Sequence, residues 1–197
     1  MLYALWSPKG GSGTSVVCAA LGSFLARRRP TLLVDLDGDL PAIAGAVPSR
    51  YRPPVGSYPY PTLAHWLAAG PMAETDALDD LVQPVGDRLG LLPLGARILS
   101  MTGFPAESGA ALAVALSAGP TAVVDAGRAE HHIQRALVEV ADASVLVVRG
   151  CYLALRRAVD DDLTARAAGV VVVEEAGRAL GPVEVADVLG CPVLATV

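Results

Sequence analysis

The sequence predicts an α/β fold with a doubly wound, mainly parallel sheet and helices on both of its faces. Short apolar runs alternate along the chain with longer segments of helical character, which is typical of this class. The composition is 53% hydrophobic but only 5% aromatic, and the mean hydropathy is +0.48, which suits a tightly layered core of Ala, Val and Leu. A length of 197 residues fits one domain, which we expect to span 1–197.

The first half of the chain begins the alternation. The apolar run Leu2–Trp6 predicts a short buried strand, and Thr14–Arg29 carries an apolar stripe at helical spacing that Pro30 ends. Thr31–Asp35 is a continuous apolar run with β-branched members, as expected of a parallel strand covered on both faces. Further elements are expected in the order helix, helix, strand and helix at Thr62–Ala69, Asp76–Val82, Leu89–Pro93 and Ala106–Ala118.

The second half continues in the same order. Strands are expected at Thr121–Asp125, Ser144–Arg149, Val170–Val173 and Val193–Val197. Helices are expected at Glu130–Val140, Leu153–Ala168 and Val183–Leu189. Segment 50–61 is rich in Pro and Tyr and predicts a surface loop within the domain, because core-like segments resume on both sides. Its stiff, low-entropy residues suit a partner surface, and a loop folded against its own domain fits as well.

Composition and patterning exclude several classes of protein. The net charge of −5 gives no generally basic surface, so we do not expect direct DNA binding. No apolar run reaches the roughly 18 residues of a transmembrane helix, and we do not expect the first residues to act as a signal peptide. The three cysteines, Cys18, Cys151 and Cys191, are far apart in apolar surroundings and predict buried thiols. These features together favour a cytoplasmic protein.

A glycine-rich segment joins the first predicted strand to the first predicted helix. It contains Lys9, the only lysine in a chain with 15 basic residues. Glycines let successive backbone N–H groups cradle phosphate oxygens, and the start of the helix adds the positive end of its dipole. Ser15, just inside that helix, is suitably placed for Mg²⁺ that bridges the phosphates. A strand-to-helix turn without a ligand is the alternative interpretation.

Three motifs carry a resemblance to a known family. The loop pattern KGG-x-G-T-[ST] resembles the deviant Walker A loop of the ParA/MinD superfamily, and is most similar to its CpaE/TadZ branch, where threonine commonly replaces the second lysine. Leu33-Val34-Asp35-Leu36-Asp37 is similar to the second-strand motif of that superfamily, and Val123-Val124-Asp125-Ala126-Gly127 to its Walker-B-type strand. Val147-Val148-Arg149, with the helix that follows, resembles its V-V-x-P segment.

This resemblance implies a nucleotide site with defined roles. The residues that would bind ATP are Lys9, Gly10, Gly11, Ser12, Gly13, Thr14 and Ser15. Ser15, Asp35 and Asp125 would hold Mg²⁺, and Asp37 would position water for hydrolysis. Lys9 would also be catalytic, because it would reach the phosphates of the partner subunit across a nucleotide-sandwich homodimer.

The residues themselves leave other roles open for the four aspartates. A carboxylate at the end of an apolar strand costs less free energy when Mg²⁺ or a hydroxyl group meets it. Capping of the strand ends is the alternative interpretation for Asp35 and Asp125. Asp37 and Asp39 flank Gly38, and either could simply be a turn residue.

Two departures from the family pattern shape the expected function. Thr14 replaces the second lysine, and Val173-Glu174-Glu175 stands where the family often has an adenine-reading asparagine. We therefore expect slow or absent hydrolysis, and a weak ATPase at most. The main hypothesis is a nucleotide-dependent dimerising switch, similar to CpaE/TadZ, that positions or assembles a cellular machine with a protein partner. The alternative is a pseudo-ATPase scaffold with constitutive contacts, and a small-molecule ligase or kinase is a third hypothesis.

We expect structural roles for the histidines and for the clustered arginines. Adjacent helical residues diverge by about 100°, so His131 and His132 do not suit a shared metal, and we expect them and His65 to be surface or capping residues. Arg27–Arg29 form the C-terminal end of the expected helix Thr14–Arg29, where cations favourably meet the negative end of the dipole. A surface that contacts DNA or lipid is the alternative for these arginines.

Overall fold

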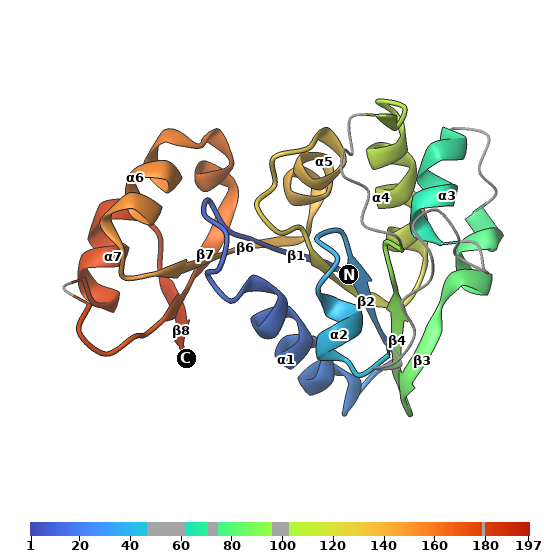
Figure 1. Cartoon of the computed structure of the whole chain (residues 1–197), viewed down its shortest axis with the longest axis horizontal. Helices are drawn as coiled ribbons and strands as arrows, with labels where there is room; N and C mark the ends of the chain where they lie inside the picture. Colours follow the sequence, from blue (N-terminus) through green and yellow to red (C-terminus); the bar gives the residue numbers. More distant parts are fainter. Residues whose placement is uncertain (47–61, 71–74, 96–102, 179) are drawn as a thin grey trace.

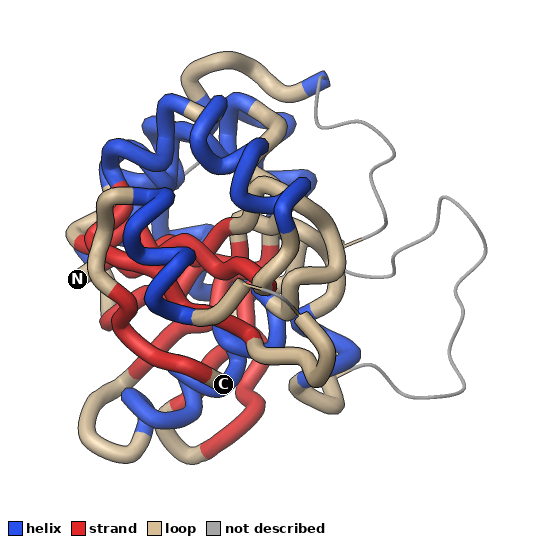
Figure 2. Tube along the Cα trace, turned by 90° about the vertical axis from the view of Figure 1, so that its left-hand side faces the viewer, coloured by secondary structure: helices blue, strands red, loops and turns tan. Residues whose placement is uncertain are grey.

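An eight-stranded sheet forms the centre of the protein (Figures 1 and 2). The computed structural model describes residues 1–46, 62–70, 75–95, 103–178 and 180–197. The strands are β1 (Leu2–Trp6), β2 (Thr31–Asp35), β3 (Gln83–Gly86), β4 (Leu89–Leu92), β5 (Thr121–Asp125), β6 (Ala143–Arg149), β7 (Ala167–Val173) and β8 (Val193–Thr196). Their order is β3-β4-β2-β5-β1-β6-β7-β8, and among the described strands only β3 and β4 pair antiparallel. The predicted fold class is therefore confirmed.

Helices cover both faces of this sheet, as Figure 1 shows. The helices are α1 (Thr14–Ala26), α2 (Leu40–Ile43), α3 (Leu63–Ala69), α4 (Ser108–Ala118), α5 (His132–Val140), α6 (Tyr152–Asp160) and α7 (Pro182–Leu189). Successive residues of a strand point to opposite faces, and β2 illustrates this arrangement. Leu33 packs in the core layer that contains Cys18 of α1, whereas Val34 packs in the layer that contains Ile133 of α5.

The helix expected at Thr14–Arg29 ends at Ala26, and the other main differences lie in short or interrupted segments. The sequence analysis missed β3, because this mostly exposed edge strand contains Pro84 and Gly86 and no apolar run. It also missed α2, which has only four residues. The segment Asp76–Val82, expected as a helix, forms the 3₁₀ helix η2 (Thr75–Leu81).

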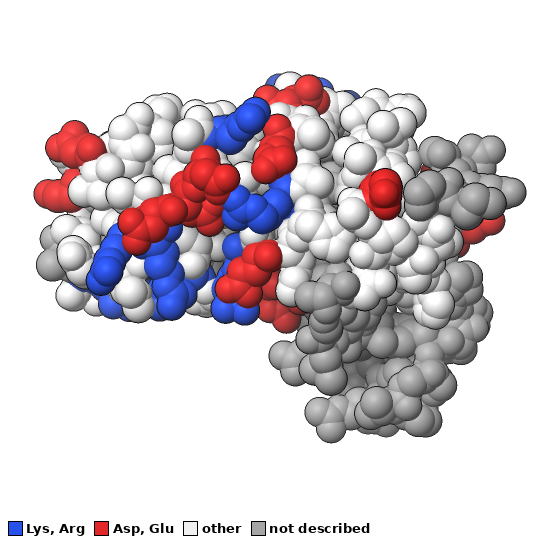
Figure 3. All heavy atoms as spheres, turned by 90° about the horizontal axis from the view of Figure 1, so that it is seen from above, with Lys and Arg blue, Asp and Glu red and all other residues white. Residues whose placement is uncertain are grey.

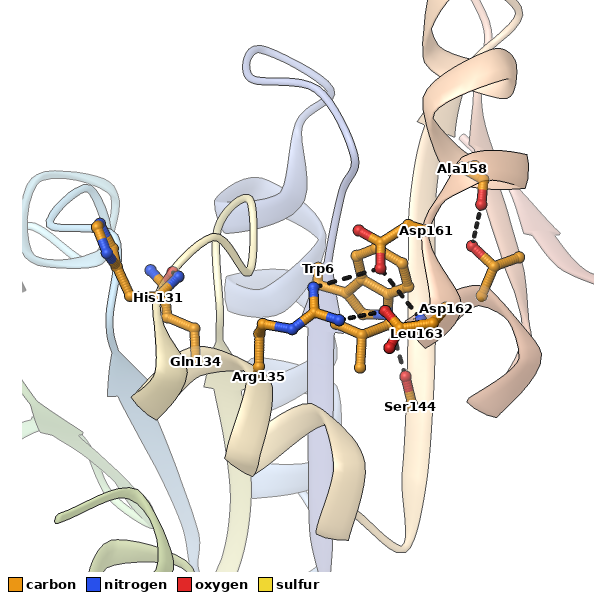
Figure 4. A network of polar contacts seen from close by, with 10 residues as sticks. Trp6, His131, Gln134, Arg135, Ser144, Ala158, Asp161, Asp162 and Leu163 are labelled. Carbon is orange, nitrogen blue, oxygen red and sulfur yellow. Dashed lines mark hydrogen bonds and ion pairs between the residues drawn. The ribbon is translucent and has the colours of Figure 1, made fainter. Parts of the chain in front are cut away.

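The helix expected at Leu153–Ala168 was wrong in its extent. Helix α6 ends at Asp160, the 3₁₀ helix η4 (Asp162–Arg166) follows, and β7 begins at Ala167. The Asp161 carboxylate accepts a hydrogen bond from the Leu163 N–H at 3.1 Å, which caps η4 and competes with a continuous helix. Arg135 of α5 pairs with Asp161 at 3.3 Å and also with Asp162, and so fixes the break from outside (Figure 4).

The structure also tests the smaller predictions. His65 forms a capping box with Thr62 at the start of α3, and His131 is the N-cap of α5, as expected of capping residues. Cys18 is buried, but Cys151 and Cys191 are partly exposed, so the expectation of three buried thiols was wrong. The predicted 50–61 loop lies outside the described residues. None of the helices in the described ranges is long and apolar enough to cross a membrane.

Candidate functional site

The glycine-rich loop lies at the carboxyl end of β1, in the middle of the sheet between β5 and β6. Open α/β sheets bind their ligands at this edge. Gly11 and Gly13 have φ angles of +77° and +93°, a region that side chains rarely adopt, so the path of the loop requires glycine there. Gly13 is also the N-cap of α1, and the first N–H groups of that helix have no partner within it. The loop therefore has the features of an anion site.

Two serines hold the loop in this shape. The Ser12 hydroxyl lies 2.7 Å from the Lys9 carbonyl oxygen and 2.7 Å from the Ser7 hydroxyl, forming a short hydrogen-bond chain inside the loop. The Ser7 N–H donates to the Gly127 carbonyl at 2.8 Å, which ties the loop to the segment after β5. Both serines are buried. The sequence analysis did not identify the bracing role of Ser7, which only the folded contacts reveal.

Asp35 and Asp125 end the adjacent strands β2 and β5, where they are paired directly across the strands and fully buried. Oδ1 of Asp35 accepts from the Gly38 N–H at 2.7 Å, and Oδ1 of Asp125 accepts from the Gly127 N–H at 3.1 Å. The Ser15 side chain also lowers the pKa of Asp125 and so favours its ionised form. Within the described residues, Oδ2 of each carboxylate is buried and has no hydrogen-bond partner.

Burial raises the pKa values of the aspartates at this edge of the sheet. Burial raises the pKa of Asp125 to about 7, and hydrogen bonds from Ser15 and Gly127 oppose part of that rise. Burial likewise raises the pKa of Asp35. The pKa of Asp37 is raised by burial and by the charge of Asp39, against the attraction of Arg128. A buried acceptor without a partner is rare in proteins, so these atoms mark a place where a cation fits.

A cavity of about 250 Å³ opens over the loop. It is lined by Ser7, Lys9, Gly10, Gly11, Ser12, Gly13, Thr14, Ser15, Val16, Asp37, Asp39, Ile43, Gly127, Arg128 and Arg149. The fold thus brings the predicted loop residues and Asp37 to one cavity. Arg128 and Arg149 were missed by the sequence analysis. One signal could have found them. Arg128 follows β5 and Arg149 ends β6, and these are the two strands next to β1 in the sheet.

The described residues contain no cluster of three or more His, Cys, Asp or Glu side chains that could by itself hold a metal ion. Mg²⁺ usually keeps several waters and binds through one or two carboxylates together with substrate phosphates. The Ser15 hydroxyl and the free oxygens of Asp35 and Asp125 are donors of that kind.

A second, more open hollow of about 510 Å³ borders the loop at Pro8. Its charges are mixed, because Arg128 pairs with Glu130 at 2.7 Å and Arg135 pairs with Asp161 at 3.3 Å. In the view from above, basic and acidic side chains are interleaved in a band across the molecule (Figure 3). This arrangement differs from the continuous basic surface that phosphate backbones of nucleic acids attract.

Comparison with known proteins adds to this geometry. No protein-family model matches the sequence, and no curated protein matches it. The septum site-determining protein MinD of Pyrococcus horikoshii, solved with Mg-ADP, has a TM-score of 0.79 at 18% identity, covering 100% of this chain and 80% of MinD. A ParA family ATPase from Chlorobium tepidum has a TM-score of 0.73 at 20% identity, covering 100% and 82%. An ATP complex of a Cyanothece McdA variant has a TM-score of 0.72 at 16% identity, again covering 100% and 82%.

The fold and the loop together define a class of α/β structure with a glycine-rich loop at the carboxyl end of the central strand. More particularly, the described residues have the fold of the ParA/MinD ATPases. The likeness extends over the whole chain at low sequence identity, and it concerns the fold.

Proposed function

We propose that this protein binds ATP and Mg²⁺ at Lys9–Ser15 within a single nucleotide-binding domain, and that it works as a nucleotide-dependent dimerising switch. One observation carries the proposal. Two buried carboxylate oxygens, one on Asp35 and one on Asp125, have no partner in the described structure and lie beside a loop shaped for an anion. An anion site next to a cation site is what a magnesium–polyphosphate ligand needs.

Different residues would bind the metal ion, the phosphates and the water. Ser15, Asp35 and Asp125 would hold Mg²⁺, which when bound neutralises charge on the phosphates. The loop N–H groups, ordered by Ser12 and Gly13, bind phosphate oxygens. Asp37 orients water near the end of the phosphate chain if hydrolysis occurs. Because Thr14 adds no positive charge, turnover is slow or absent.

The switch operates through dimerisation across the nucleotide. Lys9, which has no ion-pair partner among the described residues, reaches the phosphates bound by a second copy of the chain. A γ-phosphate that is contacted from both subunits shifts the monomer–dimer equilibrium toward the dimer. A partner protein then distinguishes the dimer from the monomer. In its role, this protein is similar to the CpaE/TadZ branch, which positions or assembles a cellular machine.

Two features favour a second candidate, a pseudo-ATPase scaffold. Thr14 lacks the phosphate-binding charge of lysine, and Glu174 adds a negative charge where the family often reads adenine. A scaffold of this kind dimerises or binds its partner in the same way with and without nucleotide. Its nucleotide site is a remnant of the fold.

The mass of the protein in solution separates the two functions. It is measured without nucleotide, with Mg-ADP and with Mg-ATP, and calorimetry records binding under each condition. We expect a dimer only with Mg-ATP, and we expect Lys9→Ala to abolish it. Arg88→Ala removes one exposed positive charge from the turn between β3 and β4, far from the loop in the sheet order, and is the matched control. One unchanged mass with no heat of binding would establish the scaffold instead.

A further inference from the structure

An arginine from outside the glycine-rich loop lies at the candidate phosphate site. Arg149 is the last residue of β6, the strand that pairs with β1, and it lines the same cavity as Lys9 and Thr14. Its side chain is 35% exposed, yet its Nε is buried and has no hydrogen-bond partner within the described residues. A guanidinium donor is therefore available at a buried position on the border of the cavity.

A counter-ion holds the other side of this guanidinium. Nη1 of Arg149 pairs with Oε1 of Glu175, which follows β7. The second carboxylate oxygen of Glu175 accepts a hydrogen bond from Nε of Arg178 at 2.7 Å. Hydrogen bonding from Arg178 and the charges of Arg149, Arg178 and Lys9 lower the pKa of Glu175. Glu175 is therefore ionised, and it lies within the electrostatic influence of both Lys9 and Arg149.

Sheet register brings these groups together. Arg149 of β6 is the direct partner of Val173 at the end of β7, and Glu175 is two residues further along. Arg178 lies three residues beyond Glu175, outside the residues that line the cavity over the loop. Glu175 can therefore keep one arginine partner on its own loop when the other one leaves.

The loop has too few positive charges to balance a bound polyphosphate. A polyphosphate carries several negative charges, and Lys9 is the only lysine in the chain. Position 14, where lysine normally serves a phosphate-binding loop, is threonine. A guanidinium is always charged, is weakly hydrated and has several donors, so it can bind a phosphate oxygen and still keep another contact.

We infer that Arg149 is a second phosphate-binding cation of this site, and that Glu175 is the counter-ion from which it turns when a polyphosphate binds. This inference rests on the proposed nucleotide function. It adds to that function a specific residue on a different strand, which supplies the charge that Thr14 does not. Arg178 then neutralises Glu175 in the liganded protein.

Calorimetry on the full chain tests the inference with two ligands, Mg-ATP and magnesium–inorganic triphosphate. Arg149→Ala should weaken the binding of both by roughly 10- to 100-fold, the range for charge-assisted hydrogen bonds. Arg149→Lys should recover part of the loss, because it restores the charge without the planar donors. Arg88→Ala, which removes an exposed positive charge from the turn between β3 and β4, is the matched control and should stay within about threefold of the unmodified chain. Glu175→Gln removes the competing carboxylate and should strengthen the binding of both ligands.

Several outcomes would overturn the inference. Equal affinities of Arg149→Ala and the unmodified chain would remove Arg149 from the site. A loss for Mg-ATP without a loss for triphosphate would assign Arg149 to the base or ribose, and weaker binding by Glu175→Gln would contradict its role as a competitor. If the unmodified chain binds neither ligand, the proposed function fails as well. If Lys9→Ala alone weakens binding, the proposed function stands and the inference about Arg149 fails.

Discussion

At the scale of single residues, the buried carboxylates connect stability to function. A carboxyl group with a pKa of about 7 in the folded protein and about 3.9 in the unfolded chain makes the folded state bind more protons between these values. The contribution of Asp125 to stability is therefore complete at low pH and is lost as the pH rises from about 4 to about 7. The slope is at most about 1.4 kcal/mol per pH unit.

Asp125→Asn should remove this dependence. We expect the variant to have a free energy of unfolding about 1–4 kcal/mol higher than the unmodified protein at pH 8, and a similar one near pH 4, without metal or nucleotide. Urea unfolding at several pH values measures the difference. Asp87→Asn, in the exposed turn between β3 and β4, is the control and should leave the pH profile unchanged. Asp125→Asn should also lose magnesium-dependent nucleotide binding. Equal pH profiles for Asp125→Asn and the unmodified chain would contradict the prediction.

At the scale of elements, the position of the loop depends on how closely α1 approaches the sheet. Gly22 faces β2, and a Cβ atom there would lie 2.5 Å from Cδ2 of Leu33, a side chain that is 1% exposed. A buried neighbour of this kind has little room to move. The helix that begins at the phosphate loop is therefore held against the strand that ends at Asp35.

Gly22→Ala should therefore destabilise the protein, although alanine favours a helix. Overpacking a core costs about 1–3 kcal/mol, and the gain in helix propensity is about 1 kcal/mol. We expect a net loss of about 1 kcal/mol, which lowers the melting temperature by about 2–4 °C in a chain of this size. Gly103→Ala, where a Cβ atom would meet nothing within 4 Å, is the control. A higher melting temperature for Gly22→Ala would show that Leu33 can yield without cost.

The elements also show which features the sequence can predict. The strands at Thr31–Asp35 and Thr121–Asp125 are continuous apolar runs because both of their faces are buried, so their positions could be predicted. The loop could be predicted because its residues are contiguous and follow a strand. The end of α6 could not, because the local cap by Asp161 acts together with Arg135, which lies on another helix. The pairing of Arg149 with Glu175 likewise depends on the register of β6 and β7, which no local pattern contains.

At the scale of the whole molecule, ligand binding should raise the free energy of unfolding. A ligand that binds only the folded state at 100 times its dissociation constant adds about 2.7 kcal/mol. For a chain of this size, that gain raises the melting temperature by about 5–11 °C. We expect this increase with Mg-ATP in a thermal melt, and we expect EDTA to remove most of it, because the buried oxygens of Asp35 and Asp125 then lack their cation. An equal increase with and without EDTA would contradict the magnesium site.

Dimerisation should also make the melting temperature depend on protein concentration. If Mg-ATP binding were confined to one subunit, the melting temperature at saturating ligand would not depend on protein concentration. If Lys9 contacts phosphates of a second copy, the liganded state is a dimer, and mass action makes the melting temperature rise with protein concentration. We therefore expect a rise across a hundredfold range of protein concentration with Mg-ATP, and none with Mg-ADP or in Lys9→Ala. A concentration-independent melting temperature with a full Mg-ATP shift would leave the nucleotide site in place and rule out dimerisation across the nucleotide.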